Sequence, residues 1–234
     1  MTLPAHLSVS SIQTYMRCPA QWHRRYVLKI QDPPTPQMAF GKAFGVALEA
    51  LHKHQDAEAA WVQAHAAALP GIHPSAEFGL TLLRLYRERG VIAGVPEQRF
   101  RLKLPDRSLP PLLGFMDLMT PRGVVEVKTS AARWDQTRCD AELQAAAYAW
   151  AFGELNKRPA EHVRYLVFST RTPSLTEILT YPGANELRLF ELAAIAAWDG
   201  ITGGRFDGCG RCALCKPAAA YDGPTLEFKT GGEK

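Results

Sequence analysis

The sequence predicts a mixed α/β fold with an N-terminal helical elaboration and a C-terminal cysteine loop. Alanine-rich segments of helical character occupy much of the first 90 residues. From about residue 95 apolar and polar residues alternate, which is typical of strands, and further helical and strand-like segments follow to about residue 201. Three cysteines then lie close together in CGRCALC, residues 209–215.

The N-terminal helices are predicted from caps and apolar spacing. Ser10 or Ser11 would cap a helix in SVSSIQTYMRCPAQWHRRYVLKI, and Cys18-Pro19 would interrupt this helix before a second helical turn. The proline-rich stretch QDPPTPQ forms a break after it. Three further segments are predicted to be helical, the first two of them alanine-rich: residues 39–54, 57–69 and 76–90.

The strands are predicted from alternation and turn residues. VPEQRFRLKL begins the series, and Thr120-Pro121-Arg122-Gly123 is a good turn between the next two strands. The predicted strands are residues 95–104, 112–119, 123–130, 162–169 and 174–181, and the predicted helices among them are residues 137–155 and 185–201. We expect one compact domain made of a helical region, a core, a cysteine loop and a tail: residues 1–94, 95–203, 204–217 and 218–234.

Composition and charge leave most classes of soluble protein open. Hydrophobic residues make up 47% of the chain and charged residues 21%, as in ordinary globular proteins. No apolar run approaches the roughly 20 residues of a membrane span, and MTLPAHLSVSS lacks the basic start and apolar core of a signal peptide. We therefore expect a cytoplasmic protein without a membrane partner. The net charge of +4 permits an anionic partner but does not indicate one.

The stretch VVEVKTS carries two charges in a strand that otherwise has a buried character. Glu126 and Lys128 are two residues apart and point to the same face. A four-residue loop would pair Met119 with Val124, so that Asp117 lies opposite Glu126, and two like charges there need a proton or a cation between them. Mg²⁺, which prefers oxygen ligands, suits them, and Lys128 could orient water or stabilise phosphate charge. The alternative is a solvated face of an edge strand.

These residues resemble the core of the PD-(D/E)XK nucleases, and the wider sequence resembles their RecB-like branch. GFMD with Asp117 and EVKTS with Glu126 and Lys128 resemble the D…(D/E)-x-K core. SVSSIQTYMRCPAQWHRRYV resembles the N-terminal signature of the branch, PEQRF its glutamate-bearing strand, and QAAAYAWAF its Q-x-x-x-Y. The resemblance extends over about residues 8–150. It implies a restriction-endonuclease-like mixed β-sheet core flanked by helices.

The resemblance assigns roles to the core residues. Asp117, Glu126 and the backbone carbonyl of Val127 would bind Mg²⁺ or Mn²⁺. Lys128 would be the catalytic lysine. The implied activity is metal-dependent hydrolysis of the phosphodiester bonds of DNA.

Further candidate residues surround the core. Gln144 and Tyr148 lie four apart on one helical face, where the resemblance implies that they support the site and contact DNA. Glu97 is a supporting or metal-site carboxylate, or a surface residue of an edge strand. One departure is Gly45 in GKAFGVALE, where the family often has a metal-binding histidine. His52 shares the helix face but lies roughly 10 Å further along, too far to be expected as a substitute.

The cysteines predict a metal centre. Cys209, Cys212 and Cys215 bring three thiolates into one short loop, and an odd total of five in a reducing compartment favours metal binding over disulfides. Cys18 or Cys139 would complete a tetrahedral zinc site or an iron–sulfur cluster. Resemblance to iron–sulfur members of the branch, including the AddB and CRISPR-adaptation nucleases, favours Cys18 and a 4Fe–4S cluster of structural role. Zinc is the alternative, because the family triplet commonly has a longer second gap.

These features together predict a metal-dependent deoxyribonuclease, and an exonuclease in preference to an endonuclease. It would act on DNA ends or single strands in recombination, repair, phage replication or CRISPR spacer processing, with a helicase, recombination or CRISPR-adaptation partner. Basic residues could contact phosphates or simply form a solvated face: Arg24, Arg25, Arg99, Arg101 and Lys103. The alternatives are a DNA-binding or partner module that does not cut, and a zinc-stabilised interaction domain.

Overall fold

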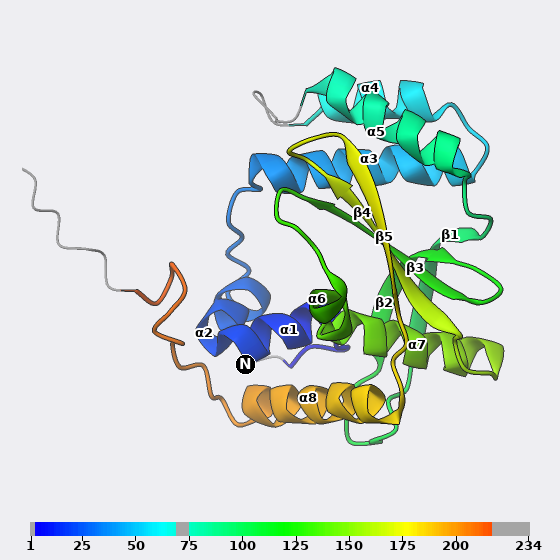
Figure 1. Cartoon of the computed structure of the whole chain (residues 1–234). Helices are drawn as coiled ribbons and strands as arrows, with labels where there is room; N and C mark the ends of the chain where they lie inside the picture. Colours follow the sequence, from blue (N-terminus) through cyan, green and yellow to red (C-terminus); the bar gives the residue numbers. More distant parts are fainter. Residues whose placement is uncertain (1–2, 69–74, 217–234) are drawn as a thin grey trace, which may run out of the picture.

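A five-stranded mixed sheet forms the centre of the computed structural model, which describes residues 3–68 and 75–216 (Figure 1). The strands lie side by side in chain order: β1 (Val95–Leu102), β2 (Leu112–Met119), β3 (Gly123–Ser130), β4 (His162–Ser169) and β5 (Ser174–Thr180). β3 and β4 are parallel, and the other neighbours are antiparallel. The predicted mixed α/β fold is therefore confirmed.

Three helices cover one face of the sheet: α3 (Pro36–His52), α4 (Ala57–Ala66) and α5 (Ala76–Arg89) (Figure 1). Phe40 and Phe44 of α3 pack edge-on against Trp61 of α4, and Phe44 also meets Phe168 of β4. All four side chains are fully buried, and burying each one contributes about 1.5–3 kcal/mol. This aromatic cluster fixes α3 across the sheet, above the centre of β3.

The helices of the opposite face are α1 (Val9–Arg17), α2 (Pro19–Trp22), the π-helix η1 (His23–Val27), α6 (Gln136–Asp140), α7 (Leu143–Asn156) and α8 (Ala184–Thr202). α7 lies against β1, β3 and β4, while α8 packs on α7 and α1 (Figure 1). Small buried residues, Ala147 and Ala151 of α7 and Ala194 and Ala197 of α8, line this second core. Because they are small, α7 approaches the sheet closely.

Two details of the predicted helices are wrong. The cap of α1 is Ser8, whose hydroxyl accepts from the Ser11 N–H at 3.1 Å. Ser11 is buried and accepts instead from the Trp22 indole at 3.0 Å. The helix expected over residues 137–155 is two helices, because Glu142 takes an extended conformation and begins α7 anew. The interruption at Cys18-Pro19 is confirmed.

The remaining predicted elements agree with the structure within a few residues. The turn at residues 120–123 forms, with the Thr120 N–H donating to the Gly123 carbonyl at 2.9 Å, and Met119 pairs with Val124 as predicted. Within the described stretches, no helix combines the length and apolar character needed to cross a bilayer. The expected tail over residues 218–234, and the end of the helix expected over residues 57–69, lie outside the described residues.

Candidate active site

The candidate site lies where β2 and β3 stop pairing. Their ladder contains only Leu118–Val125 and Met119–Val124. Beyond this ladder, the Val127 N–H, two residues after Val125, donates to the Asp117 carboxylate at 2.7 Å, so a side chain replaces a ladder hydrogen bond. The regular pairing thus ends one step before Asp117 would face Glu126 directly. The sheet is forked at this point, and both carboxylates line the cavity beside the fork.

The cavity has a volume of about 300 Å³. That is space for about ten waters at about 30 Å³ each, enough for a hydrated cation and a phosphate group. Its walls come from α3, α5 and the first four strands: Gly41, Gly45, Leu48, Glu49, His52, Tyr86, Glu97, Asp117, Leu118, Val125, Glu126, Val127, Lys128, Thr129 and Leu166. The structure therefore brings five sequence-predicted site residues, Glu97, Asp117, Glu126, Val127 and Lys128, to one cavity.

Lys128 is held by two oxygens on the α7 side of the sheet. Its Nζ lies 2.6 Å from Glu126 Oε1 and 2.7 Å from Gln144 Oε1. Gln144 Nε2 in turn donates to the Tyr148 hydroxyl at 2.9 Å, and that hydroxyl donates to the Phe115 carbonyl at 2.6 Å. Each hydrogen bond of this chain joins a donor to an acceptor, so the Gln144 amide has one consistent orientation. The predicted common face of Glu126 and Lys128 is confirmed.

The site gathers more carboxyl groups than the single charge of Lys128 could balance if all of them were ionised. Burial, and then the nearby Asp117 carboxylate, raise the pKa of Glu126 to about 8. Burial also raises the pKa of Asp117. Burial alone would lower the pKa of Lys128, but the attraction of Glu126 outweighs this and the pKa is raised, so the amine keeps its proton. Glu126 is 4% exposed and its Oε2 has no hydrogen-bond donor, which is a costly arrangement unless a proton or a cation is present.

Glu97 of β1 also points to this cavity, through a strained backbone. Its neighbours pair regularly, Pro96 with Leu118 and Gln98 with Met116, but Glu97 itself is unpaired and has φ of +49°. This left-handed conformation costs a residue with a side chain about 1–2 kcal/mol. Burial, and then the charge of Asp117, raise the pKa of Glu97. Glu97 thus lines the cavity from an exposed position on the edge strand β1, which is consistent with both of its predicted interpretations.

The α3 wall shows how Gly45 affects the site. A β-carbon added at Gly45 would meet nothing within 4 Å, so open space lies where the family often has a histidine. Glu49 and His52, one and two turns further along, line the same cavity. His52 Nε2 lies 3.3 Å from the Tyr86 hydroxyl, and burial lowers the pKa of His52. The i, i+4, i+7 spacing of Gly45, Glu49 and His52 predicts that they share one face of the helix. The distance between Gly45 and His52 along the helix argued against His52 as a substitute for the family histidine.

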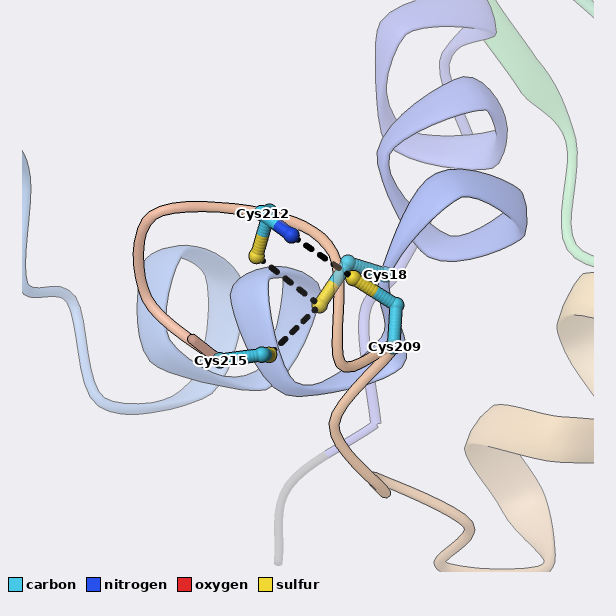
Figure 2. Close-up of side chains that lie close together, drawn as sticks. All are labelled: Cys18, Cys209, Cys212 and Cys215. Atoms are coloured by element: carbon cyan, nitrogen blue, oxygen red, sulfur yellow. Dashed lines mark hydrogen bonds between the residues drawn. The ribbon is translucent and has the colours of Figure 1, made fainter. Parts of the chain in front are cut away.

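The four cysteines form a second cluster, away from the cavity. Figure 2 shows Cys18 beside Cys209, Cys212 and Cys215, and their sulfurs all lie within 4.8 Å of one another. Cys139 is buried elsewhere, among the residues packed between α7 and β4. The structure therefore places Cys18, and not Cys139, with the C-terminal triplet.

The predicted basic residues do not line the cavity. Arg24 pairs with Asp32 at 2.6 Å, and Arg25 lies over the Tyr26 ring. Arg99, Arg101 and Lys103 are exposed along β1 and just beyond it. Both of their interpretations, phosphate contact and solvated surface, remain predictions.

A buried and a half-buried carboxylate beside a lysine, at a cavity of this size, define a candidate site for metal-assisted hydrolysis of an anionic substrate. Comparison with protein-family models identifies the class of protein to which this site belongs. The family model of the PD-(D/E)XK nuclease superfamily matches residues 6–219, and the chain belongs to that superfamily. A search of curated proteins finds no significant match.

One solved structure supports the fold, and a second is reported beside it. A crystal structure described as that of a candidate exonuclease from Eubacterium rectale, determined at 2.19 Å, is similar over 96% of each chain, with a TM-score of 0.65 and 13% sequence identity. At this identity the similarity supports the restriction-endonuclease-like fold alone. The structure of the protein SSO0001 matches more weakly, with a TM-score of 0.43 and 16% identity over 84% of this chain and 78% of the other.

Proposed function

We propose that this chain is a metal-dependent deoxyribonuclease that acts as an exonuclease on DNA ends or single strands. The observation that supports this most strongly is the buried Glu126, whose Oε2 lacks a partner beside Asp117 and within reach of Lys128. In a member of a nuclease superfamily, this arrangement suits a divalent cation at the carboxylates and a phosphodiester above them.

Asp117, Glu126 and the Val127 carbonyl are the proposed ligands for Mg²⁺ or Mn²⁺. When bound there, the cation would supply Lewis-acid stabilisation of the phosphate and a lower pKa for water. The fit rests on the chemistry of the donors: hard oxygens, excess negative charge and an unpartnered buried oxygen. Asp117 lies close enough to Glu97 for its charge to raise the pKa of Glu97. We propose Glu97 as a supporting carboxylate.

Lys128 is the proposed catalytic lysine. An ammonium group has three donors, and Glu126 and Gln144 use two of them. The third can donate to the attacking water or to a phosphate oxygen in the cavity that Lys128 lines. Gln144 and Tyr148 are proposed as positioning residues, because they hold the amine through the Gln144 Oε1 and anchor it to β2.

The test is cleavage of end-labelled single- and double-stranded DNA and of covalently closed circles, with Mg²⁺, Mn²⁺ or a chelator. We expect metal-dependent degradation from ends, intact circles, and a loss of about 10²-fold or more in Glu126→Gln. Glu161→Gln, an exposed partner of Arg122, is the matched control and should cut normally. Cleavage of circles would show endonuclease action. No cleavage by metal-loaded protein would favour a module that binds DNA without cutting it.

Replacing Asp117 by asparagine is expected to stabilise the metal-free protein. In the wild type the Val127 N–H donates to the Asp117 carboxylate at 2.7 Å, and an asparagine Oδ1 can still accept this hydrogen bond. The substitution removes the negative charge beside the buried Glu126. We expect the free energy of unfolding at about pH 8 to rise by about 1–2 kcal/mol without metal. We also expect stabilisation by Mg²⁺ or Mn²⁺ to be lost in this variant.

The pH dependence of the metal-free protein follows from Glu126. Burial and Asp117 raise its folded-state pKa to about 8, above the unfolded value of about 4.3. The stability gained from the protonated group is therefore complete below about pH 4 and lost as the pH rises through about 8. Thermal melts in a chelator should show this loss, and less of it in Asp117→Asn. The exposed Asp199→Asn is the control; a larger loss in Asp117→Asn than in the wild type would contradict the argument.

The narrower assignments stay predictions. These are membership of the RecB-like branch, a place in recombination, repair, phage replication or CRISPR spacer processing, a helicase, recombination or CRISPR-adaptation partner, and a cytoplasmic location. We propose a structural role for the four-cysteine centre, because it joins the α1–α2 junction to the segment after α8.

A further inference from the structure

The four cysteine sulfurs lie at distances that match a single metal ion. Cys18 Sγ is 3.5 Å from Cys215 Sγ and 3.7 Å from Cys212 Sγ, and no two of the four sulfurs are more than 4.8 Å apart (Figure 2). Zinc binds thiolates at about 2.3 Å, so a regular tetrahedron around it has edges of about 3.8 Å. The cysteine site therefore has the size of a zinc tetrahedron.

A 4Fe–4S cluster does not fit between these sulfurs. In such a cluster each of the four thiolates binds a different iron, and the irons and sulfides form a cube between them. The thiolates bind to the outside of the cube at different iron corners. The distances between their sulfurs are therefore longer than the distances between the irons. Sulfurs at 3.5 and 3.7 Å are in van der Waals contact and leave room for one ion at their centre.

Backbone groups around the sulfurs support thiolates in this compact arrangement. The Gln21 N–H donates to Cys18 Sγ and the Cys212 N–H donates to Cys209 Sγ, both at 3.4 Å. Such outer hydrogen bonds fix the orientation of metal ligands. Gly210 has φ of +66°, which lets the loop turn back between Cys209 and Cys212.

Contacts that involve no metal hold the chain just before the cysteine loop. The Tyr15 hydroxyl donates to the Arg205 carbonyl at 2.7 Å, and the Ala20 N–H donates to the Asp207 carbonyl at 3.3 Å. Phe206 stacks between Trp22 and His23, with ring centroids at 5.8 and 4.5 Å. These contacts bring Cys209 to within reach of Cys18 and restrict how far the site can expand.

We infer that Cys18, Cys209, Cys212 and Cys215 bind one tetrahedral Zn²⁺, in place of the iron–sulfur cluster that the family resemblance implies. The ion joins the α1–α2 junction to the segment after α8. The inference concerns a site separate from the cavity, and it stands or falls independently of the nuclease activity.

Metal analysis of the full chain tests the inference. The protein is purified without oxygen from cells supplied with both iron and zinc, and zinc, iron and acid-labile sulfide are measured per chain. We expect about one zinc and no stoichiometric iron or sulfide in the wild type and in Cys139→Ala, and zinc reduced at least about tenfold in Cys18→Ser. About four irons with about four sulfides per chain would overturn the inference, as would the absence of any stoichiometric metal.

A cobalt titration keeps the test independent of how a variant folds. Metal-stripped wild-type protein is titrated with Co²⁺, whose visible absorption is intense and distinctive when four thiolates surround it tetrahedrally. We expect this spectrum to saturate at about one equivalent and to disappear when Zn²⁺ is added. A spectrum of octahedral Co²⁺, or none, would overturn the single-ion site.

Discussion

DNA cleavage by Lys128→Ala is expected to be about 10²–10³-fold slower than cleavage by the wild type, which is the typical cost of removing one charged donor from a preorganised site. The structure gives the reason. Glu126 and Gln144 fix the Lys128 amine at 2.6 and 2.7 Å, and Tyr148 fixes Gln144. The positive charge is therefore positioned before the substrate arrives. Single-turnover rates at saturating DNA and metal measure the chemical step separately from binding.

Two further variants separate the charge of Lys128 from its packing. Lys128→Gln retains a polar group beside Glu126 and Gln144 but removes the charge, and it should lose nearly as much activity as Lys128→Ala. Lys157→Asn is the matched control, because Lys157 is exposed at the end of α7 and its left-handed backbone suits asparagine. A rate within about threefold of the wild type in both Lys128 variants would show that Lys128 is not the catalytic lysine.

The hairpin could be predicted because its geometry depends on nearby residues only. A four-residue turn fixes the register of Met119 and Val124, and the two-residue period then places Glu126 and Lys128 on one face. The helical spacing of Gln144 and Tyr148 similarly predicted a shared face, and the two residues are hydrogen-bonded at 2.9 Å. Local periodicity thus placed the centre of the candidate site.

The shape of the site could not be predicted, because it depends on tertiary packing. Nothing in the strand pattern shows that β2 and β3 stop pairing after Leu118 and Val125, or that Glu97 takes a left-handed conformation. The place of His52 in the cavity follows from the way α3 crosses the sheet, which the aromatic cluster around Trp61 determines. Residues far apart in the sequence supply these constraints.

Cys18→Ser is expected to cause the largest loss of stability among the variants considered. The proposed metal centre would link Cys18 to Cys215, which are 197 positions apart in the sequence. A metal ion that binds the folded chain and is released on unfolding stabilises the fold by its binding free energy, which is about 4–5 kcal/mol when the free metal is roughly 1,000-fold or more above its Kd. At about 2–4 °C per kcal/mol for a chain of this size, the melting temperature should fall by roughly 8–20 °C.

Limited proteolysis shows where Cys18→Ser loses its structure. Arg205 and Arg211 are exposed on the segment that the metal centre fixes, so trypsin should cut there at least about tenfold faster in the variant, before it cuts the sheet. Wild-type protein stripped of metal should behave in the same way. Cys139→Ala is the matched control, since Cys139 is buried away from the metal centre and its variant should keep the segment protected. Equal cutting of Cys18→Ser and the wild type would mean that Tyr15, Trp22 and their contacts hold the segment without any metal, because those contacts remain in both proteins.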